Sequence, residues 1–195
     1  LRGRFPETPV MALTATATDR VRQDIVSQLQ LRNPSRFVAS FNRGNLTYRV
    51  VARSQPLNQN LDVAKRHDGE SGIIYCASRN ATERLAKRLS EQGLRCAAYH
   101  AGLDAGPRSK NQEAFIRDEI QIVCATIAFG MGIDKPDVRF VAHLDLPKTI
   151  EAYYQETCRA GRDGTPAKDW KIYGMQDVIK LRQMMHGYKG SEKHK

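Results

Sequence analysis

Several features that mark common protein classes are missing from this chain of 195 residues. It has no phosphate-binding loop of the form G-x-x-x-x-G-K-[ST], and its four cysteines form no C-x-x-C pair. It has no signal peptide, and no apolar run approaches the length of a membrane span. These absences argue against a complete P-loop nucleotide site, a disulfide-rich secreted domain and a membrane protein. Because the five histidines are scattered, we expect no metal site within the chain.

Positive charge, by contrast, is in excess. The formal net charge is +10 and the sequence pI is about 9.7. This balance favours a polyanionic partner, most simply nucleic acid, although a soluble basic protein without such a partner is the alternative. The basic residues are dispersed, so we expect a folded positive surface and not a disordered arm. We expect an intracellular protein, and the first residue, Leu1, suggests a fragment or a processed product.

Short apolar runs alternate with amphipathic helical stretches, which predicts βαβ units around a parallel sheet. The expected fold is α/β, with a mostly parallel central sheet covered by helices on both faces. Candidate strands cover residues 10–13, 36–41, 46–51, 73–76, 95–99, 121–126, 138–144 and 170–173. Candidate helices follow residue 16 and cover residues 57–66, 79–92, a stretch opened by Gly106 and Pro107, 149–157 and 175–186.

Two arginines, Arg159 and Arg162, lie three residues apart at the expected end of a helix, with glycines around them. A guanidinium group keeps its charge at any working pH and forms two parallel hydrogen bonds to a phosphate. The spacing can therefore direct two guanidinium groups at one phosphoryl group, as in enzymes that transfer phosphate. The alternative is a basic helix end whose charge offsets the helix macrodipole.

Five sequence blocks occur in one order, at residues 12–17, 72–79, 98–103, 125–136 and 155–164. Together they resemble the RecQ family of DNA helicases. The resemblance runs from about Phe5 to Tyr173 and covers the second of the family's two RecA-like lobes, with the last strand of the first lobe. The chain departs from the family at Cys158, where glycine is usual.

The resemblance implies a RecA-like fold and a division of the chain into three parts. Residues 1–32 would end the first lobe with its last strand, a coupling motif and a helix. Residues 33–174 would form the second lobe. Residues 175–195 would form a helix and tail that lead to a zinc-binding region outside the chain.

The resemblance also implies an ATP-dependent 3′-to-5′ DNA helicase, located in the nucleus or the bacterial cytoplasm. Its partners would be single-stranded and duplex DNA and the first lobe of the same protein, with no membrane. ATP and Mg²⁺ would be held mainly by the first lobe, and Zn²⁺ only by a downstream domain. Without the first lobe, we expect the chain alone to be inactive.

Five residues are expected to act on the nucleotide. The resemblance implies that Arg159 and Arg162 contact the γ-phosphate and that Gln155 senses the nucleotide. Asp134 would reach the ribose, and Gly132 would allow a close approach of the main chain. For Asp134, stabilisation of a turn before Lys135 is the alternative.

A second set of residues is expected to contact DNA. The resemblance implies this role for Ser78, Arg79, Tyr99, His100 and Thr126. Because ligands gather beyond the carboxyl ends of parallel strands, Ser78, His100 and Thr126 are expected on one edge of the sheet. The alternatives are a helix N-cap for Ser78 and a partly buried pair for Tyr99 and His100.

Thr14 and Thr16 resemble the motif that couples nucleotide state to strand separation, and Thr16 is also a candidate helix N-cap. Two other functions remain open. A lobe of a DEAD-box-like RNA helicase is disfavoured by Gln155, where that family commonly has histidine. A non-catalytic nucleic-acid-binding module gains some weight from Cys158.

Overall fold

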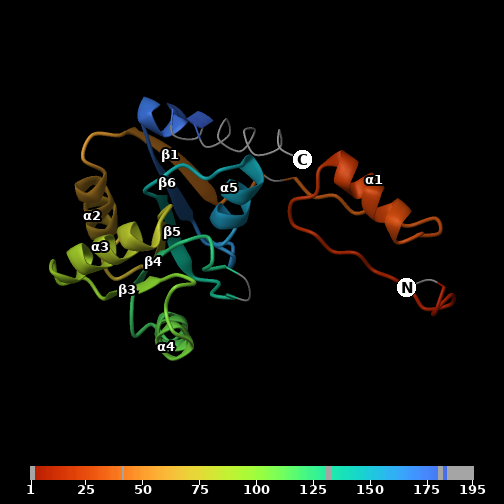
Figure 1. Cartoon of the computed structure of the whole chain (residues 1–195), viewed down its shortest axis with the longest axis horizontal. Helices are drawn as coiled ribbons and strands as arrows, with labels where there is room; N and C mark the ends of the chain where they lie inside the picture. Colours follow the sequence, from red (N-terminus) through yellow and green to blue (C-terminus); the bar gives the residue numbers. More distant parts are fainter. Residues whose placement is uncertain (1–2, 41, 131–132, 180–181, 184–195) are drawn as a thin grey trace, which may run out of the picture. The chain divides into compact units, whose positions relative to one another are not determined.

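A computed structural model of the chain describes residues 3–40, 42–130, 133–179 and 182–183 (Figure 1). It divides into two compact units, Leu1–Arg43 and Gly44–Lys195. Gly132 and most of the expected helix after residue 179 lie outside the described residues. None of the helices in the described part of the chain is long and apolar enough to cross a membrane.

The second unit is built on a six-stranded sheet in which every pair of neighbouring strands is parallel. The α/β prediction is therefore confirmed, with a sheet that is parallel throughout. The order is β1-β6-β5-β2-β4-β3. The strands are β1 (Leu46–Ala52), β2 (Ser71–Tyr75), β3 (Cys96–Tyr99), β4 (Ile122–Ala125), β5 (Val138–His143) and β6 (Ala167–Tyr173).

Helices cover both faces of this sheet (Figure 1). On one face, α2 (Pro56–Arg66) and α3 (Arg79–Ser90) bury leucine, valine and alanine side chains against strand residues such as Ile74 and Phe140. On the other face, α4 (Ala105–Ile116) contributes Phe115 to a second core with Ile73 and Val141. Successive strand residues point to opposite faces, so the continuous apolar strands supply both cores.

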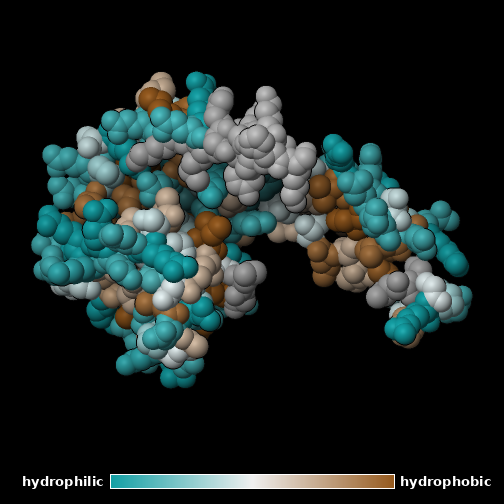
Figure 2. Space-filling view, in the orientation of Figure 1, coloured by the Kyte–Doolittle hydropathy of each residue, from teal (hydrophilic) through white to brown (hydrophobic). Residues whose placement is uncertain are grey.

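Capping residues explain where several helices begin and end. Ser78 and Thr149 are the N-caps of α3 and of α5 (Ile150–Thr157), and each side-chain oxygen accepts a main-chain N–H three residues later. Gly93 has φ +83° just beyond α3, a conformation that glycine adopts without strain. The surface over α2 and α3 is mostly hydrophilic, as expected for amphipathic helices (Figure 2).

The first unit differs from the sequence expectation. Residues 10–13 and 36–40 form no strand, and Phe41 lies outside the described residues. A strand needs a neighbour for its main-chain hydrogen bonds, and here Met11, Leu13 and Phe37 are 81%, 86% and 95% exposed. That residues 10–13 form the last strand of a preceding lobe stays a prediction.

The helix α1 (Asp19–Gln28) also begins later than expected. Its N-cap is Thr18, whose Oγ1 accepts the Val21 N–H at 3.4 Å. The N-cap alternative for Thr16 is therefore wrong. Thr16 instead donates its main-chain N–H to the Thr14 hydroxyl at 3.5 Å, which is turn geometry before the helix.

Candidate nucleotide and nucleic-acid site

The parallel register brings four chain segments to one edge of the sheet. Ala125, the last residue of β4, pairs with both Tyr75 and Tyr99, the last residues of β2 and β3. Tyr75 also pairs with His143, the last residue of β5. The segments that follow β2, β3 and β4 carry Ser78, His100 and Thr126, so these residues leave the sheet at the same edge, as expected.

Two of the expected DNA contacts are exposed at this edge. Ser78 and Arg79 are both exposed, at the start of α3. The Ser78 Oγ accepts the Ala81 N–H at 3.2 Å, so the N-cap alternative is confirmed. Its hydroxyl hydrogen is still available for donation, because a hydroxyl both accepts and donates. A Cβ added to Gly102 would lie 2.7 Å from Arg79 Nη1, so Arg79 packs on the loop after β3.

Tyr99 and His100 have other surroundings. Tyr99 is 9% exposed, packs edge-on against Phe129 and donates its hydroxyl to Gln112 Oε1 at 3.3 Å. His100 is 3% exposed, with its Nε2 2.9 Å from Glu83 Oε1. The alternative of a partly buried pair therefore describes their side chains. Their main chain remains at the edge, where the Thr126 N–H donates to the Tyr99 carbonyl at 3.1 Å.

The guanidinium of Arg159 lies against the loop after β4. A Cβ added to Gly130 would collide with Arg159 Nη2, so only glycine leaves room for the side chain in this position. Burial raises the pKa of the Tyr75 hydroxyl, and the positive charge of Arg159 beside it acts in the opposite direction. Tyr75 donates that hydroxyl to the Phe129 carbonyl at 3.1 Å. Arg159 is thus placed between β2 and the turn at Gly130.

Arg162 and Asp134, both expected at the nucleotide, are in direct contact. Arg162 Nη1 lies 3.0 Å from Asp134 Oδ1 and donates to the Ile133 carbonyl at 3.2 Å. The Asp134 side chain is 89% exposed, and that of Arg162 is 33% exposed. An ion pair this exposed contributes only about 0–1 kcal/mol, so a stronger anion can displace the carboxylate.

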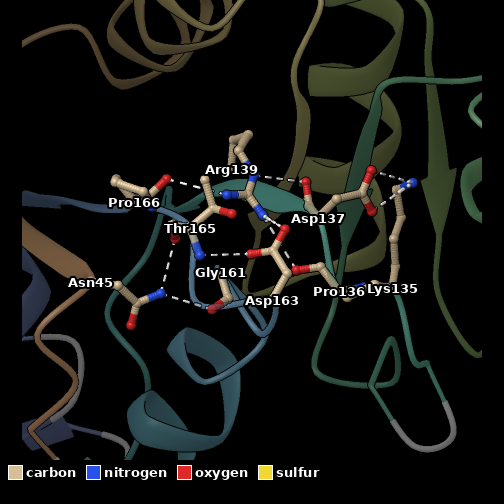
Figure 3. A network of polar contacts seen from close by, with 9 residues as sticks. All are labelled: Asn45, Lys135, Pro136, Asp137, Arg139, Gly161, Asp163, Thr165 and Pro166. Atoms are coloured by element: carbon tan, nitrogen blue, oxygen red, sulfur yellow. Dashed lines mark hydrogen bonds and ion pairs between the residues drawn. The ribbon is translucent and has the colours of Figure 1, made fainter.

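A network of polar contacts fastens the loop after Arg162 (Figure 3). Arg139 donates to Asp163 Oδ2 at 2.7 Å and to the carbonyls of Pro136, Asp137 and Pro166. From the turn just before β1, the Asn45 amide donates to the carbonyls of Gly161 and Thr165 at 2.8 and 2.9 Å. Hydrogen bonding from Arg139 lowers the pKa of Asp163.

The loop that carries Asp134 has an anchor of its own in Lys135. Lys135 Nζ is buried and lies 2.7 Å from Asp118 Oδ1 and 3.1 Å from Asp137 Oδ1. The hydrogen bond from Lys135 lowers the pKa of Asp118. Asp118, in the turn before β4, therefore fixes the far end of the loop.

Gln155 and Cys158 lie at the end of α5. Gln155 is exposed, and its carbonyl accepts the Cys158 thiol at 3.2 Å. Cys158 is the C-cap residue, with φ −65° and ψ −5°. Any residue adopts this conformation, so the turn does not require the glycine that is usual in the resembled family.

A buried polar cluster under α5 was missed by the sequence reasoning. His143 is fully buried, with Nε2 2.8 Å from Glu156 Oε2 and Nδ1 3.3 Å from Asp169 Oδ1. Tyr153 donates its hydroxyl to Asp169 Oδ2. The available signal was a histidine inside the apolar run 138–144, but its partners follow only from the pairing of strands.

Two further predicted residues, Thr14 and Thr16, belong to the first unit, whereas the sheet belongs to the second. Among residues 3–40, 42–130, 133–179 and 182–183, no group of three or more His, Cys, Asp or Glu side chains is arranged to hold a metal ion.

Comparison with known proteins identifies the type of domain. The profile of the helicase conserved C-terminal domain family matches residues 53–164, more than half of the chain. The ATP-dependent DNA helicase RecQ of Haemophilus influenzae is 48% identical over 185 residues, which are 95% of this chain and 30% of that protein. This chain belongs to the RecQ family, as its helicase C-terminal domain. The resemblance seen in the motifs is thereby confirmed.

Other relatives extend the match to eukaryotes. The RecQ-like DNA helicase BLM of Xenopus laevis is 47% identical over 199 residues, which cover 100% of this chain and 14% of that protein. The helicase SGS1 of Saccharomyces cerevisiae is 44% identical over 186 residues, or 94% and 13% of the two chains. This RecQ-type domain thus spans less than a third of the length of these relatives.

Among solved structures, S. cerevisiae Dbp5 bound to RNA and ADP BeF3 superposes with a TM-score of 0.73. The match covers 90% of this chain and 47% of Dbp5, at 18% sequence identity. At that identity the likeness establishes the fold alone, and it confirms the RecA-like architecture.

Proposed function

We propose that this domain is the second motor lobe of an ATP-dependent 3′-to-5′ DNA helicase and supplies arginine fingers for ATP hydrolysis. The observation that carries the proposal is the position of Arg159 beside Gly130 and of Arg162 beside Asp134, at the carboxyl edge of a parallel sheet. Ligands of such sheets bind beyond this edge. The relatives named above as ATP-dependent DNA helicases support the same activity.

The two arginines fit a phosphate. Arg159 Nε is buried without a hydrogen-bond partner among the described residues, and a donor in that position gains from a bound anion. The charged partner of Arg162, Asp134, forms only a weak, exposed pair with it, and the other contacts of the guanidinium are hydrogen bonds to the carbonyls of Ile133 and Cys158. ATP would supply the phosphoanhydride bond whose cleavage drives the motor. We propose that the preceding lobe holds most of the ATP and its Mg²⁺, with zinc confined to a later domain.

The rest of the nucleotide contact involves residues beside the arginines. Asp134, freed from Arg162, is exposed and available to the ribose hydroxyls. Gln155 lies on the last turn of α5, one helical turn before Arg159, as a nucleotide-sensing residue requires. Gly132 is proposed to allow the main chain to approach the nucleotide.

We further propose that single-stranded DNA lies along the same edge, across the starts of the segments after β2, β3 and β4. Ser78 and Arg79 are exposed and Thr126 is half-buried, and hydroxyl and guanidinium groups there bind phosphates without reading bases. Tyr99 and His100 act through their main chain, because their side chains are buried and bonded within the domain.

Residues 1–32, which make up most of the first unit, are proposed to end the preceding lobe and to couple the two lobes through Thr14 and Thr16. Their surface supports this, because Met11 and Leu13 are each more than four-fifths exposed. Large exposed apolar side chains in one short segment mark a contact surface for another part of a protein. The chain alone is accordingly expected to show no ATPase activity.

The nucleotide role is tested by Arg162→Ala in the whole protein, with DNA-stimulated ATP hydrolysis and DNA affinity measured together. Loss of an arginine finger lowers turnover by roughly 10³–10⁵-fold. DNA affinity is expected to stay nearly unchanged. The control is Arg117→Ala, which removes an exposed arginine paired with Glu113 at the end of α4. Unchanged turnover in Arg162→Ala would refute the finger role and leave the non-catalytic nucleic-acid-binding module.

The DNA role is tested by Arg79→Ala, with affinity for single-stranded DNA measured over a range of salt concentrations. Loss of one phosphate contact is expected to weaken binding equally for all sequences and to reduce the salt slope by about 1. Arg84→Ala is the matched control, since Arg84 is an exposed arginine of the same helix. Equal effects in the two variants would mean that Arg79 contributes only to the general positive charge.

A further inference from the structure

The buried cluster around His143 joins three elements under the last motif, the sequence block of residues 155–164. His143 ends β5 and has no exposed surface, and its two ring nitrogens face carboxylates from opposite sides. Nε2 lies 2.8 Å from Glu156 Oε2 of α5, and Nδ1 lies 3.3 Å from Asp169 Oδ1 of β6. Neither Nδ1 nor Asp169 Oδ1 has a hydrogen-bond partner elsewhere among the described residues.

The number of protons decides what this cluster can do. A neutral imidazole has one N–H and attracts only one of the two carboxylates. A doubly protonated ring attracts both, and it compensates part of the buried negative charge. Burial lowers the pKa of His143, but the hydrogen bonds and charges of Asp169 and Glu156 outweigh it and raise the pKa. The other titratable groups that face the ring are Tyr75 from β2 and Tyr153 from α5.

The cluster is directly connected to the residues of the last motif. Glu156 follows Gln155 in α5, and the Glu156 carbonyl accepts the Arg159 N–H at 3.4 Å. On its other side, the His143 ring stacks on Tyr75, with ring centroids 5.7 Å apart. The same tyrosine lies beside Arg159. His143 thus contacts both the helix turn that presents Arg159 and the ring against which Arg159 lies.

We infer that His143 is a positioning residue for the last motif, because it ties Glu156 of α5 to Asp169 of β6 and so fixes the turn that carries Gln155 and Arg159. The inference rests on the proposed role of Arg159 in ATP hydrolysis. Without this tie, the end of α5 could shift and carry the Arg159 guanidinium with it. Misplacement of a catalytic group by about 1 Å can cost about 100-fold in rate.

A second buried histidine provides a matched control. His67 is 5% exposed, its Nδ1 contacts Glu70, and its Nε2 accepts the Trp170 indole N–H at 3.2 Å. It stacks on Phe140 in the core beneath α2 and α3, on the face opposite α5. Substitution of His67 therefore removes a buried histidine with a carboxylate partner but leaves the last motif untouched.

The test compares His143→Gln, His67→Gln and Arg159→Ala in the whole protein, well below their melting temperatures. His143→Gln is expected to lower kcat for ATP hydrolysis by about 10- to 100-fold with little change in KM, while His67→Gln leaves kcat unchanged. Equal kcat in the two glutamine variants overturns the inference. If Arg159→Ala retains full turnover, the proposed function itself fails, and the inference fails with it.

A measurement on the unsubstituted protein covers the case in which His143→Gln does not fold. In protein labelled with ¹⁵N in its histidine rings, both nitrogens of His143 are expected to carry protons at pH 7.5. Chemical shifts typical of a neutral ring would overturn the inference, because one of the two carboxylate contacts would then be repulsive.

Discussion

The two faces of the sheet are packed with different kinds of side chain. Beneath α2 and α3 the core consists of aliphatic, cysteine and aromatic side chains, and the buried His67 ring stacks on one of the aromatic rings, Phe140. Between α5 and the sheet lie a fully buried histidine from β5 and two buried carboxylates, one from α5 and one from β6. Burial of charge costs free energy unless every charged group is paired, so apolar side chains would fill this space at a lower cost.

The difference indicates a division of tasks. The apolar face supplies stability through area removed from water, without fixing any one side chain for chemistry. The α5 face fixes the positions of particular side chains. Hydrogen bonds and ion pairs at Arg139, His143 and Lys135 hold the loops around Arg159 and Arg162. Substitutions should therefore separate stability from activity according to the face they affect.

The largest effect on stability is expected on the α2 and α3 face. Leu85 of α3 has no exposed surface. Leu85→Ala removes buried methyl groups and leaves a cavity, so the free energy of unfolding should fall by about 2–5 kcal/mol. Urea denaturation measures this change, and kcat of the still-folded whole protein should remain unaltered. A drop in kcat at temperatures where the variant is folded would contradict the division between the faces.

The opposite outcome is expected for Gly130→Ala. The added Cβ collides with the end of the flexible Arg159 side chain, which moves aside at little cost in stability. The rate of ATP hydrolysis should fall by about 10- to 100-fold, because the guanidinium is displaced. Gly106→Ala is the control, since a Cβ there meets no atom within 4 Å. Full activity of Gly130→Ala would show that the contact between Gly130 and Arg159 is unimportant.

Much of the sheet could be predicted from the sequence, because a buried parallel strand is a short, continuous apolar run. The predicted strand 73–76 overlaps β2, and the predicted strand 121–126 contains β4. Between them, α3 begins at a recognisable cap, Ser78. The expected strand at 36–41 is not found in its described residues, 36–40, because a strand also needs a neighbouring strand to pair with. Phe37 and Val38 have strand-forming side chains, but no neighbouring strand pairs with them in this unit.

Only those residues of the candidate site that lie in the sequence motifs were predicted. Arg159, Arg162 and Asp134 were expected together, and the contact between Arg162 and Asp134 agrees with that grouping. The residues that hold them in place were not predicted. Arg139 and Asp169 gain their roles from strand pairing and loop geometry, which depend on contacts between segments far apart in the sequence.

The smallest effect is expected at the edge of the network in Figure 3, from Asp163→Asn. Hydrogen bonding from Arg139 lowers the pKa of Asp163 in the folded chain. The ionised carboxylate therefore contributes stability above the ordinary aspartate pKa of about 3.9, and this contribution is lost as the pH falls through the lower folded-state value. The wild type should be slightly more stable than Asp163→Asn near neutral pH and equal to it in acid.

Acid titration of unfolding for both proteins measures this difference, with Asp68→Asn as the control at an exposed aspartate beyond α2. A difference between wild type and Asp163→Asn that grows as the pH falls would have the wrong sign. In that case the Arg139 contact would not stabilise the ionised carboxylate.

The most direct test is a structure of the whole protein with a non-hydrolysable ATP analogue. The decisive quantity is the distance from the Arg159 and Arg162 guanidinium nitrogens to the terminal phosphate oxygens. The account predicts distances of about 2.7–2.9 Å for both side chains, as in charge-assisted hydrogen bonds. Guanidinium groups that point away from the nucleotide, with Arg162 still bound to Asp134, would contradict it.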